Sequence, residues 1–130
     1  MPCFNHRRND VYSVDVFKNP NYLKPQEKTP FMFEKYPVDR DTIFMESEHC
    51  VAFTNIRCVV QGHVLVATKR CISRVEEMSV AETKELFLNA CKIAKVLDDY
   101  YGAKSTTITV QDGEFAGQTV RHVHCHVMPR

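Results

Sequence analysis

The stretch 122–127 alternates histidines with two valines and a cysteine, and this pattern limits what the chain can fold into. Successive side chains of a β-strand point to opposite faces, so residues two apart share a face. A strand here places His122, His124 and His126 in one row, with the apolar residues on the other face. Pro129 then ends the strand, because proline cannot donate to a ladder. We therefore expect a strand that packs on one side and carries a candidate site on the other.

Composition excludes several classes of protein. The 130 residues are enough for one domain, and the hydrophobic content of 44% and charged content of 25% are ordinary for a globular chain. A net charge of +1 gives no electrostatic argument for a nucleic-acid or membrane partner. No apolar run approaches the roughly 20 residues of a membrane helix. We expect that the N-terminal residues are not a signal peptide, and none of the six cysteines forms a C-x-x-C pair. We expect reduced cysteines and a cytoplasmic location, with the nucleus as a second compartment.

Residues 1–32 differ in pattern from the rest of the chain. Four prolines interrupt them, and only residues 11–17 alternate well enough for a short strand. From Phe33 onward, strand and helix signals are regular. We therefore divide the chain into an N-terminal arm, residues 1–32, and a domain, residues 33–130.

The domain contains strand patterns separated by one long helical pattern. Strands are predicted at residues 42–47, 50–56, 63–68 and 106–111, and the histidine strand comes fifth. Strand 63–68 is almost wholly apolar and should be buried on both faces. A helix from about residue 80 to 101 carries one apolar stripe, follows a Ser79-x-x-Glu82 capping box and ends at Gly102. The order β-β-β-α-β-β predicts an α+β fold, a five-stranded antiparallel meander sheet with the helix packed on it.

Zinc binding is one chemical reading of the histidine row. Two histidines two apart on a strand can share a metal, and His63 or Cys71 could complete such a site. The third histidine argues against one zinc ion bound by all three, because positions i and i+4 of a strand lie about 13 Å apart. A structural row of satisfied histidines is a further alternative. We predict no dedicated metal site.

Covalent catalysis is the second reading. A neutral imidazole is a good nucleophile near neutral pH and attacks phosphorus as well as carbon. A middle histidine flanked by two others has proton donors within reach. The nearby Gly117-Gln118-Thr119 offers close backbone approach, an amide and a hydroxyl for phosphate oxygens.

The C-terminal residues resemble a known signature, that of the histidine triad (HIT) superfamily and of its Fhit branch in particular. The resemblance extends upstream to about Phe33, and the residues that carry it are Gln111-Asp112-Gly113-x-x-Ala116-Gly117-Gln118-Thr119-Val120-x-His122-Val123-His124-x-His126-Val127-x-Pro129-Arg130. The Gln-Asp-Gly opening and the Pro-Arg ending favour Fhit-like dinucleoside polyphosphate hydrolases over Hint-like nucleoside phosphoramidases.

The resemblance implies roles for the histidines. His124 would attack the α-phosphorus of a dinucleoside polyphosphate such as diadenosine triphosphate or tetraphosphate and form a nucleotidyl-histidine intermediate, which water then hydrolyses to AMP. His126 would bind the phosphates and assist proton transfer, and His122 would hold the geometry of the nucleophile. His63 would be a fourth, supporting histidine.

The resemblance also implies a nucleotide pocket, a cation and a partner. A Mg²⁺ ion would accompany the polyphosphate without a dedicated protein site, and the chain would form a homodimer. The candidate nucleotide-binding residues, besides His63 and His126, are Phe33, Tyr36, Phe53, Asn55, Leu65, Gln111, Gly117, Gln118, Thr119 and Val120. The alternatives are a Hint-like phosphoramidase and a nucleotide-binding signalling protein whose output is the bound complex.

Two departures from the family pattern stand out. Gln61 replaces a proline that precedes Gly-His in the family, and the chain stops at Arg130. A segment similar to one that follows the triad in Fhit proteins, residues 6–12, lies instead near the N-terminus. A circular permutation, in which the arm replaces the C-terminal segment, would explain this placement, and an unrelated arm is the simpler alternative.

Overall fold

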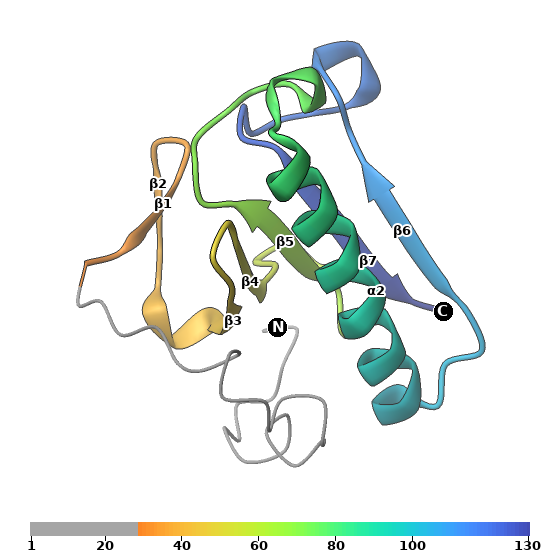
Figure 1. The fold of residues 1–130 in the computed structure, drawn as a ribbon. Helices are drawn as coiled ribbons and strands as arrows, with labels where there is room; N and C mark the ends of the chain where they lie inside the picture. The colour runs from red at the N-terminus through yellow and green to blue at the C-terminus, as the bar shows by residue number, and fades with distance from the viewer. Residues whose placement is uncertain (1–28) are drawn as a thin grey trace.

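The computed structural model describes residues 29–130, which form a sheet with one helix on one face and a small hairpin on the other (Figure 1). The long helix is α2 (Val80–Tyr101), and short 3-10 turns are η3 (Arg40–Thr42), η4 (Val75–Glu77) and η5 (Glu114–Ala116). The strands are β1 (Phe31–Phe33), β2 (Tyr36–Val38), β3 (Ile43–Glu46), β4 (Cys50–Thr54), β5 (Val64–Thr68), β6 (Thr106–Val110) and β7 (His124–Pro129). The predicted strand 11–17 and most of the arm lie outside the described residues.

Strands β3 to β7 form one antiparallel sheet in the order β3-β4-β5-β7-β6. The prediction of a five-stranded antiparallel sheet with one helix is confirmed. The meander order is correct for β3-β4-β5 and wrong for the last two strands, because β7 lies between β5 and β6. Burial explains this order. Five of the six residues of β7 are buried, whereas no residue of β6 is, so β6 is suited to the edge.

Helix α2 covers the face of the sheet away from the histidines. Its apolar stripe packs on Val64, Val66, Cys125 and Val127, which project from β5 and β7. The Ser79–Glu82 capping box opens the helix as predicted, and Gly102, with a φ of 63°, ends it. The stripe residues are Leu86, Ala90, Ile93 and Leu97. All five residues of β5 are buried, as its apolar sequence predicts.

A second apolar cluster fills the opposite face. Phe33 of β1 packs there with Phe53 and Leu65, beneath the hairpin formed by β1 and β2. The register pairs Ala67 with His124 and Leu65 with His126. Because paired residues project to the same face, the histidines of β7 lie beside this cluster and under the hairpin.

The structure departs from the expected boundaries at two places. Strand β1 begins at Phe31, two residues before the expected start of the domain, because Phe31 pairs with Val38. Strand β7 begins at His124, so His122 precedes the strand. Residue 122 donates its backbone N–H to Val120, and residue 123 donates to Ile72, which takes this segment out of the regular ladder.

Two further expectations concern membranes and cysteines. Among the helices that the structure describes, none combines the length and apolarity needed to cross a bilayer. Four described cysteines, Cys50, Cys71, Cys91 and Cys125, are free thiols. Cys58 is disulfide-bonded, so the expectation that the cysteines are reduced is wrong for this residue.

Candidate active site

His124 is held as a neutral ring with an unprotonated Nε2. Its Nδ1 lies 2.7 Å from the backbone oxygen of His122, and a carbonyl oxygen can only accept, so Nδ1 carries the hydrogen. Burial lowers the pKa of His124 below its ordinary value, which keeps the ring neutral near pH 7. In that state the lone pair is on Nε2, and this nitrogen can act as a nucleophile.

His126 has the opposite protonation pattern, and a chain of contacts determines it. The backbone N–H of Val59 donates to Nδ1 of His63 over 3.2 Å, so in neutral His63 the hydrogen is on Nε2. That Nε2 lies 2.9 Å from Nδ1 of His126 and donates to it. The hydrogen of neutral His126 is therefore on its own Nε2.

The Nε2–H of His126 is a buried donor that has no acceptor among the described residues. Burial first, and then the neighbouring His124 and His63, lower the pKa of His126 to about 4. A buried donor without a partner costs about 1–3 kcal/mol, so an oxygen of a bound ligand would be stabilised there. The rings of His124 and His126 are 4.9 Å apart, which places a lone pair and a donor side by side.

His122 serves as an anchor. Its Nε2 donates to the backbone oxygen of Thr68 over 2.6 Å, and its Nδ1 accepts from the backbone N–H of Glu34 over 3.1 Å. With both nitrogens engaged, its ring offers no free ligand atom for a metal shared with His124 and His126. Burial lowers the pKa of His122, and the ring is fully inaccessible.

Most of the predicted pocket residues from the first strands lie near these rings, and Tyr36 is the exception. Phe33 packs edge-on against His124 with ring centroids 4.9 Å apart, and Phe53 packs against Phe33. Leu65 lies opposite His126 in the ladder. Tyr36 is in the hairpin with its side chain half exposed. Asn55 follows β4, and its Nδ2 lies 3.3 Å from both ring nitrogens of His63.

The predicted phosphate loop follows β6, and a glycine brings its two ends together. Gly117 has a φ of 88°, and a Cβ there would lie 2.6 Å from Nε2 of Gln111. Gly117 thus lets the Gln111 amide lie against the loop backbone. Thr119 is exposed, and Val120 packs against the apolar cluster under the hairpin.

Gln118 is buried and already hydrogen-bonded within the protein. Its Oε1 accepts from the backbone N–H of Gly113 over 2.8 Å, and its Nε2 donates to the backbone oxygen of Ser73 over 3.0 Å. Its side chain therefore closes the loop and ties it to the segment before η4. The backbone N–H of Gln118 also donates within the loop, to the backbone oxygen of Gly113 over 3.1 Å, so Gln118 shapes the loop from both its side chain and its backbone.

Sequence reasoning missed two sets of residues. Arg74 forms an ion pair with Asp112 at 2.9 Å, and Asp112 also accepts from the backbone N–H of Val75, so η4 and the loop are joined a second time. The pair lowers the pKa of the Asp112 carboxyl. Glu34 contacts both Arg121 and His122. All these contacts join segments distant in the chain, and no local pattern marks them.

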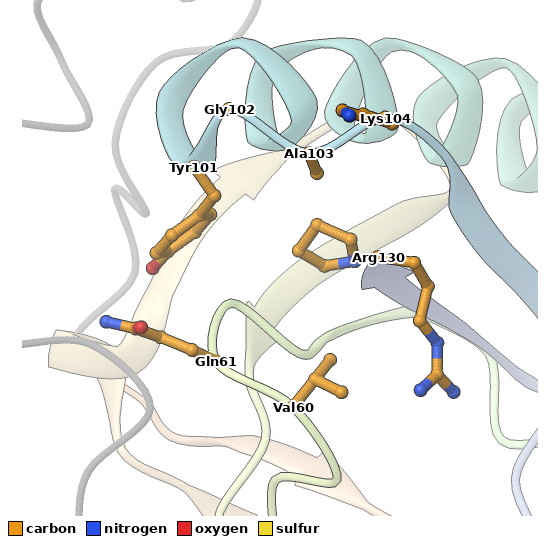
Figure 2. Close-up of a pocket in the computed structure, with 8 residues that line it drawn as sticks. Val60, Gln61, Tyr101, Gly102, Ala103, Lys104 and Arg130 are labelled. Carbon is orange, nitrogen blue, oxygen red and sulfur yellow. The ribbon is translucent and has the colours of Figure 1, made fainter.

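Other groups on the molecule lie apart from the histidines. Ligand atoms of Glu48, His49 and Glu85 lie within 4.8 Å of one another, an arrangement that could hold a metal ion. The carboxylate of Glu85 already accepts from Ser47 and from the backbone of His49. A shallow pocket of about 450 Å³ lies where α2 and β7 end (Figure 2). Its walls include Val60, Gln61, Tyr101, Lys104 and Arg130, and none of the four clustered histidines.

Comparison with known proteins supports the family resemblance. The profile of the HIT domain family matches residues 37–130. The chain is 51% identical over all its 130 residues to a nitrilase and fragile histidine triad fusion protein, NitFhit, of Drosophila melanogaster, of which it covers 28%. It is 37% identical over 102 residues to a bis(5'-adenosyl)-triphosphatase of Dictyostelium discoideum, which is 78% of this chain and 68% of that protein.

A solved structure agrees with the sequence comparisons. The crystal structure of the Caenorhabditis elegans NitFhit protein matches with a TM-score of 0.79 and 42% identity, over 82% of this chain and 26% of that chain. The present chain thus spans about a quarter of the length of the NitFhit proteins.

The alignments also bear on the N-terminal arm and on the family. The match to the fly protein covers all 130 residues and therefore includes residues 1–32. The origin of this arm, by circular permutation or as an unrelated segment, stays a prediction about residues mostly outside the described ones. The profile match over most of the chain, together with the Dictyostelium relative, establishes the family: this chain belongs to the HIT domain family.

Proposed function

We propose that this domain hydrolyses dinucleoside polyphosphates, diadenosine triphosphate or tetraphosphate, to AMP and the remaining nucleotide. The observation that carries the proposal is the complementary protonation of two adjacent rings, a free lone pair on His124 and a donor on His126. The name of the Dictyostelium relative, a bis(5'-adenosyl)-triphosphatase, supports the substrate class.

In the first step, Nε2 of His124 attacks the α-phosphorus. A phosphorus–nitrogen bond forms, and the bond from the α-phosphorus to the bridging oxygen breaks. The ring becomes cationic, and its Nδ1–H bond to the carbonyl of His122 stabilises this charge. Nε2–H of His126 donates a hydrogen bond to a phosphate oxygen. Because the leaving oxygen belongs to a phosphate, it departs as an anion without taking up a proton.

In the second step, water attacks the phosphorus of the nucleotidyl-histidine. The phosphorus–nitrogen bond breaks, its electron pair returns to Nε2 of His124, and the proton of the water is released with AMP. A nucleoside would bind beside the buried cluster of Phe33, Phe53 and Leu65, against which Val120 packs. Asn55 and Tyr36 would contact it there. Gln111 and Thr119 would contact the phosphates, and Gly117 and Gln118, whose backbone N–H groups donate within the loop, would hold the loop in shape.

A cation should accompany the substrate. The depressed pKa values of His63, His122, His124 and His126, all lowered chiefly by burial, leave these four rings uncharged at neutral pH. They cannot neutralise a polyphosphate, so we propose that Mg²⁺ enters with the substrate, bound by its phosphates.

A second copy of the chain is the proposed partner. Strand β6 pairs only with β7 among the described residues, so its other edge could pair with another strand. Ile108 on β6 and Phe87 and Leu88 on α2 are exposed apolar side chains that a homodimer would cover. Sedimentation of wild type and of Ile108→Lys would test this, since the proposal expects a dimer that the lysine weakens.

We further propose a cytoplasmic location, nuclear as well, to be tested by fractionation.

The decisive experiment is rapid quenching with diadenosine triphosphate followed by mass spectrometry. The proposal expects an AMP adduct on His124, absent from His124→Asn, while His124→Asn still binds the substrate. Competition with an adenosine phosphoramidate tests the Hint-like alternative, which expects that compound to be the preferred substrate. Turnover absent from wild type, with tight binding retained, would favour a signalling protein instead.

A further inference from the structure

Glu34 has an unusual backbone conformation beside the histidines. Its φ is 56°, and it is the one non-glycine residue with a positive φ in the part of the chain that the structure describes. This region is uncommon for residues with a Cβ, and such strain persists only where surrounding contacts maintain it. Glu34 lies in the turn between β1 and β2, the hairpin that covers the histidine face.

The contacts of Glu34 are with two consecutive residues at the far end of the chain. Its backbone N–H donates to Nδ1 of His122 over 3.1 Å. Its carboxylate Oε2 accepts from the backbone N–H of Arg121 over 2.9 Å. One residue therefore contacts the segment before β7 twice, and the strained backbone aims its N–H at the ring of His122.

This segment needs such support because it precedes the regular ladder. Its position decides where the backbone oxygen of His122 lies, and that oxygen accepts Nδ1–H of His124 over 2.7 Å. The hydrogen bond sets both the orientation of the His124 ring and the nitrogen that keeps the lone pair. A shift of the 121–122 backbone would therefore be transmitted directly to the nucleophile.

The neighbouring side chain in the hairpin supports the same coupling. The Phe33 ring lies 5.3 Å from the ring of His122 and 4.9 Å from that of His124. The hairpin thus contacts the triad both through an aromatic ring and through the two hydrogen bonds of Glu34.

We propose that Glu34 is a positioning residue for His124: through Arg121 and His122, it holds the carbonyl that orients the nucleophilic ring. The carboxylate supplies a hydrogen-bond acceptor for an N–H that would otherwise lose its partner. The kinetic part of this inference rests on the proposed hydrolysis, whereas the positioning of the ring can be measured without turnover.

The test compares three substitutions of Glu34 on the full chain. Glu34→Ala removes the acceptor and keeps a Cβ at the positive φ, Glu34→Gly removes the acceptor but relieves the backbone, and Glu34→Gln keeps an acceptor oxygen. Met32→Ala, an exposed position in the same hairpin, is the control. The readouts are kcat and KM for diadenosine triphosphate and the ¹⁵N chemical shifts of the His124 ring.

We expect kcat to fall about tenfold in Glu34→Ala and in Glu34→Gly, with KM changed less than about twofold, and to stay within about threefold of wild type in Glu34→Gln. The ¹⁵N shifts should show Nδ1–H with unprotonated Nε2 in wild type and Glu34→Gln, and a mixture of tautomers in Glu34→Ala. Met32→Ala should match wild type in both readouts.

Full kcat and an unchanged His124 tautomer in Glu34→Ala would overturn the inference. Full recovery of kcat in Glu34→Gly would also overturn it, because backbone strain would then be the cause of the loss. So would a Glu34→Gln variant as impaired as Glu34→Ala. Wild-type protein that does not hydrolyse the substrate would refute the proposed function alone, and the tautomer comparison would still decide the role of Glu34.

Discussion

Nε2 of His63 lies 2.9 Å from Nδ1 of His126, and this contact decides which nitrogen of His126 carries its hydrogen. The cause lies one step further away, in the backbone N–H of Val59, which occupies the lone pair on Nδ1 of His63. A loop amide thereby fixes the protonation pattern of a ring on another strand. His124 receives the opposite pattern from a backbone carbonyl, and the two rings become chemically distinct.

Substitution of His63 by alanine should reduce turnover but should still allow the phosphorus–nitrogen bond to His124 to form. With no donor at Nδ1, His126 can populate the tautomer that points a lone pair at the phosphate oxygen, and kcat should fall about tenfold. Stopped assays of AMP release and ¹⁵N shifts of His126 would measure this. Ile56→Ala, an exposed side chain in the same loop, should match wild type. A His63→Ala enzyme with normal kcat and an unchanged His126 tautomer would contradict the relay.

The protein should lose stability as the pH falls, already at pH values where most carboxylates are still ionised. Burial, His124 and His63 lower the pKa of His126 to about 4, so between pH 4 and about 6.5 the unfolded chain binds more protons than the folded one. The free energy of unfolding therefore rises with pH across this window, by up to about 3 kcal/mol from His126. His63, His122 and His124, whose pKa values burial also lowers, act in the same direction.

Urea unfolding at pH 4.5 and pH 7 would measure this dependence. The Arg70–Glu82 contact, which lowers the pKa of Glu82 to about 2, loses its contribution mainly below pH 4.5 and does not account for the change. His126→Asn should flatten the slope. Equal stability at the two pH values in wild type would show that the four rings are hydrated and titrate normally.

Much of the fold could be predicted from the sequence. The parts that could not be predicted all depend on contacts between residues that lie far apart in the chain. Helix α2 and its caps follow from local periodicity and from residues three apart, as do the pairs β3-β4 and β4-β5, which short turns join. The place of β7 between β5 and β6 depends on contacts between strands about 60 residues apart, which alternation does not encode. Likewise, the alternation over residues 122–126 could not predict that Val123 forms backbone hydrogen bonds with Ile72 and Thr68, outside the regular ladder.

For the candidate site too, the sequence predicted which residues are involved but not the contacts that set their chemistry. The alternation identified His124 and His126 as neighbours on one face, and the family resemblance pointed to His63. Their protonation depends on backbone groups at Val59 and His122, and no residue type at those positions signals it. Gln118 was expected as a phosphate ligand because of its amide, but both ends of that amide are engaged within the protein.

Replacing Gly117 by alanine should affect activity more than stability. A Cβ there would lie 2.6 Å from Nε2 of Gln111 and displace that amide from the loop, and the φ of 88° adds backbone strain of about 1 kcal/mol. We expect kcat/KM to fall at least about tenfold and the melting temperature to fall by about 5 °C. Gly102→Ala is the matched control, because its φ of 63° is similarly strained while nothing lies within 4 Å of the added Cβ. Equal kcat/KM in the two variants would remove Gln111 from the proposed site.

Replacing Gln118 by alanine should loosen the loop as a unit. The change leaves the N–H of Gly113 and the oxygen of Ser73 without partners, at a cost of about 1–3 kcal/mol in the free energy of unfolding. The ion pair of Arg74 with Asp112 still joins the loop to η4, so the chain should fold while the loop becomes more mobile. KM should then rise more than kcat falls, because the loop contributes to binding and the histidine rings are untouched.

Hydrogen exchange of the loop amides, together with KM for diadenosine triphosphate, would measure the effect of Gln118→Ala. Phe115→Ala removes a fully exposed side chain from the same loop and should change neither quantity. The double change Gln118→Ala with Asp112→Ala removes both connections, because Asp112 accepts from Arg74 and from the backbone N–H of Val75, and the increase in KM should exceed the product of the single effects. Additive effects in the double variant would mean that the two connections hold independent parts of the loop.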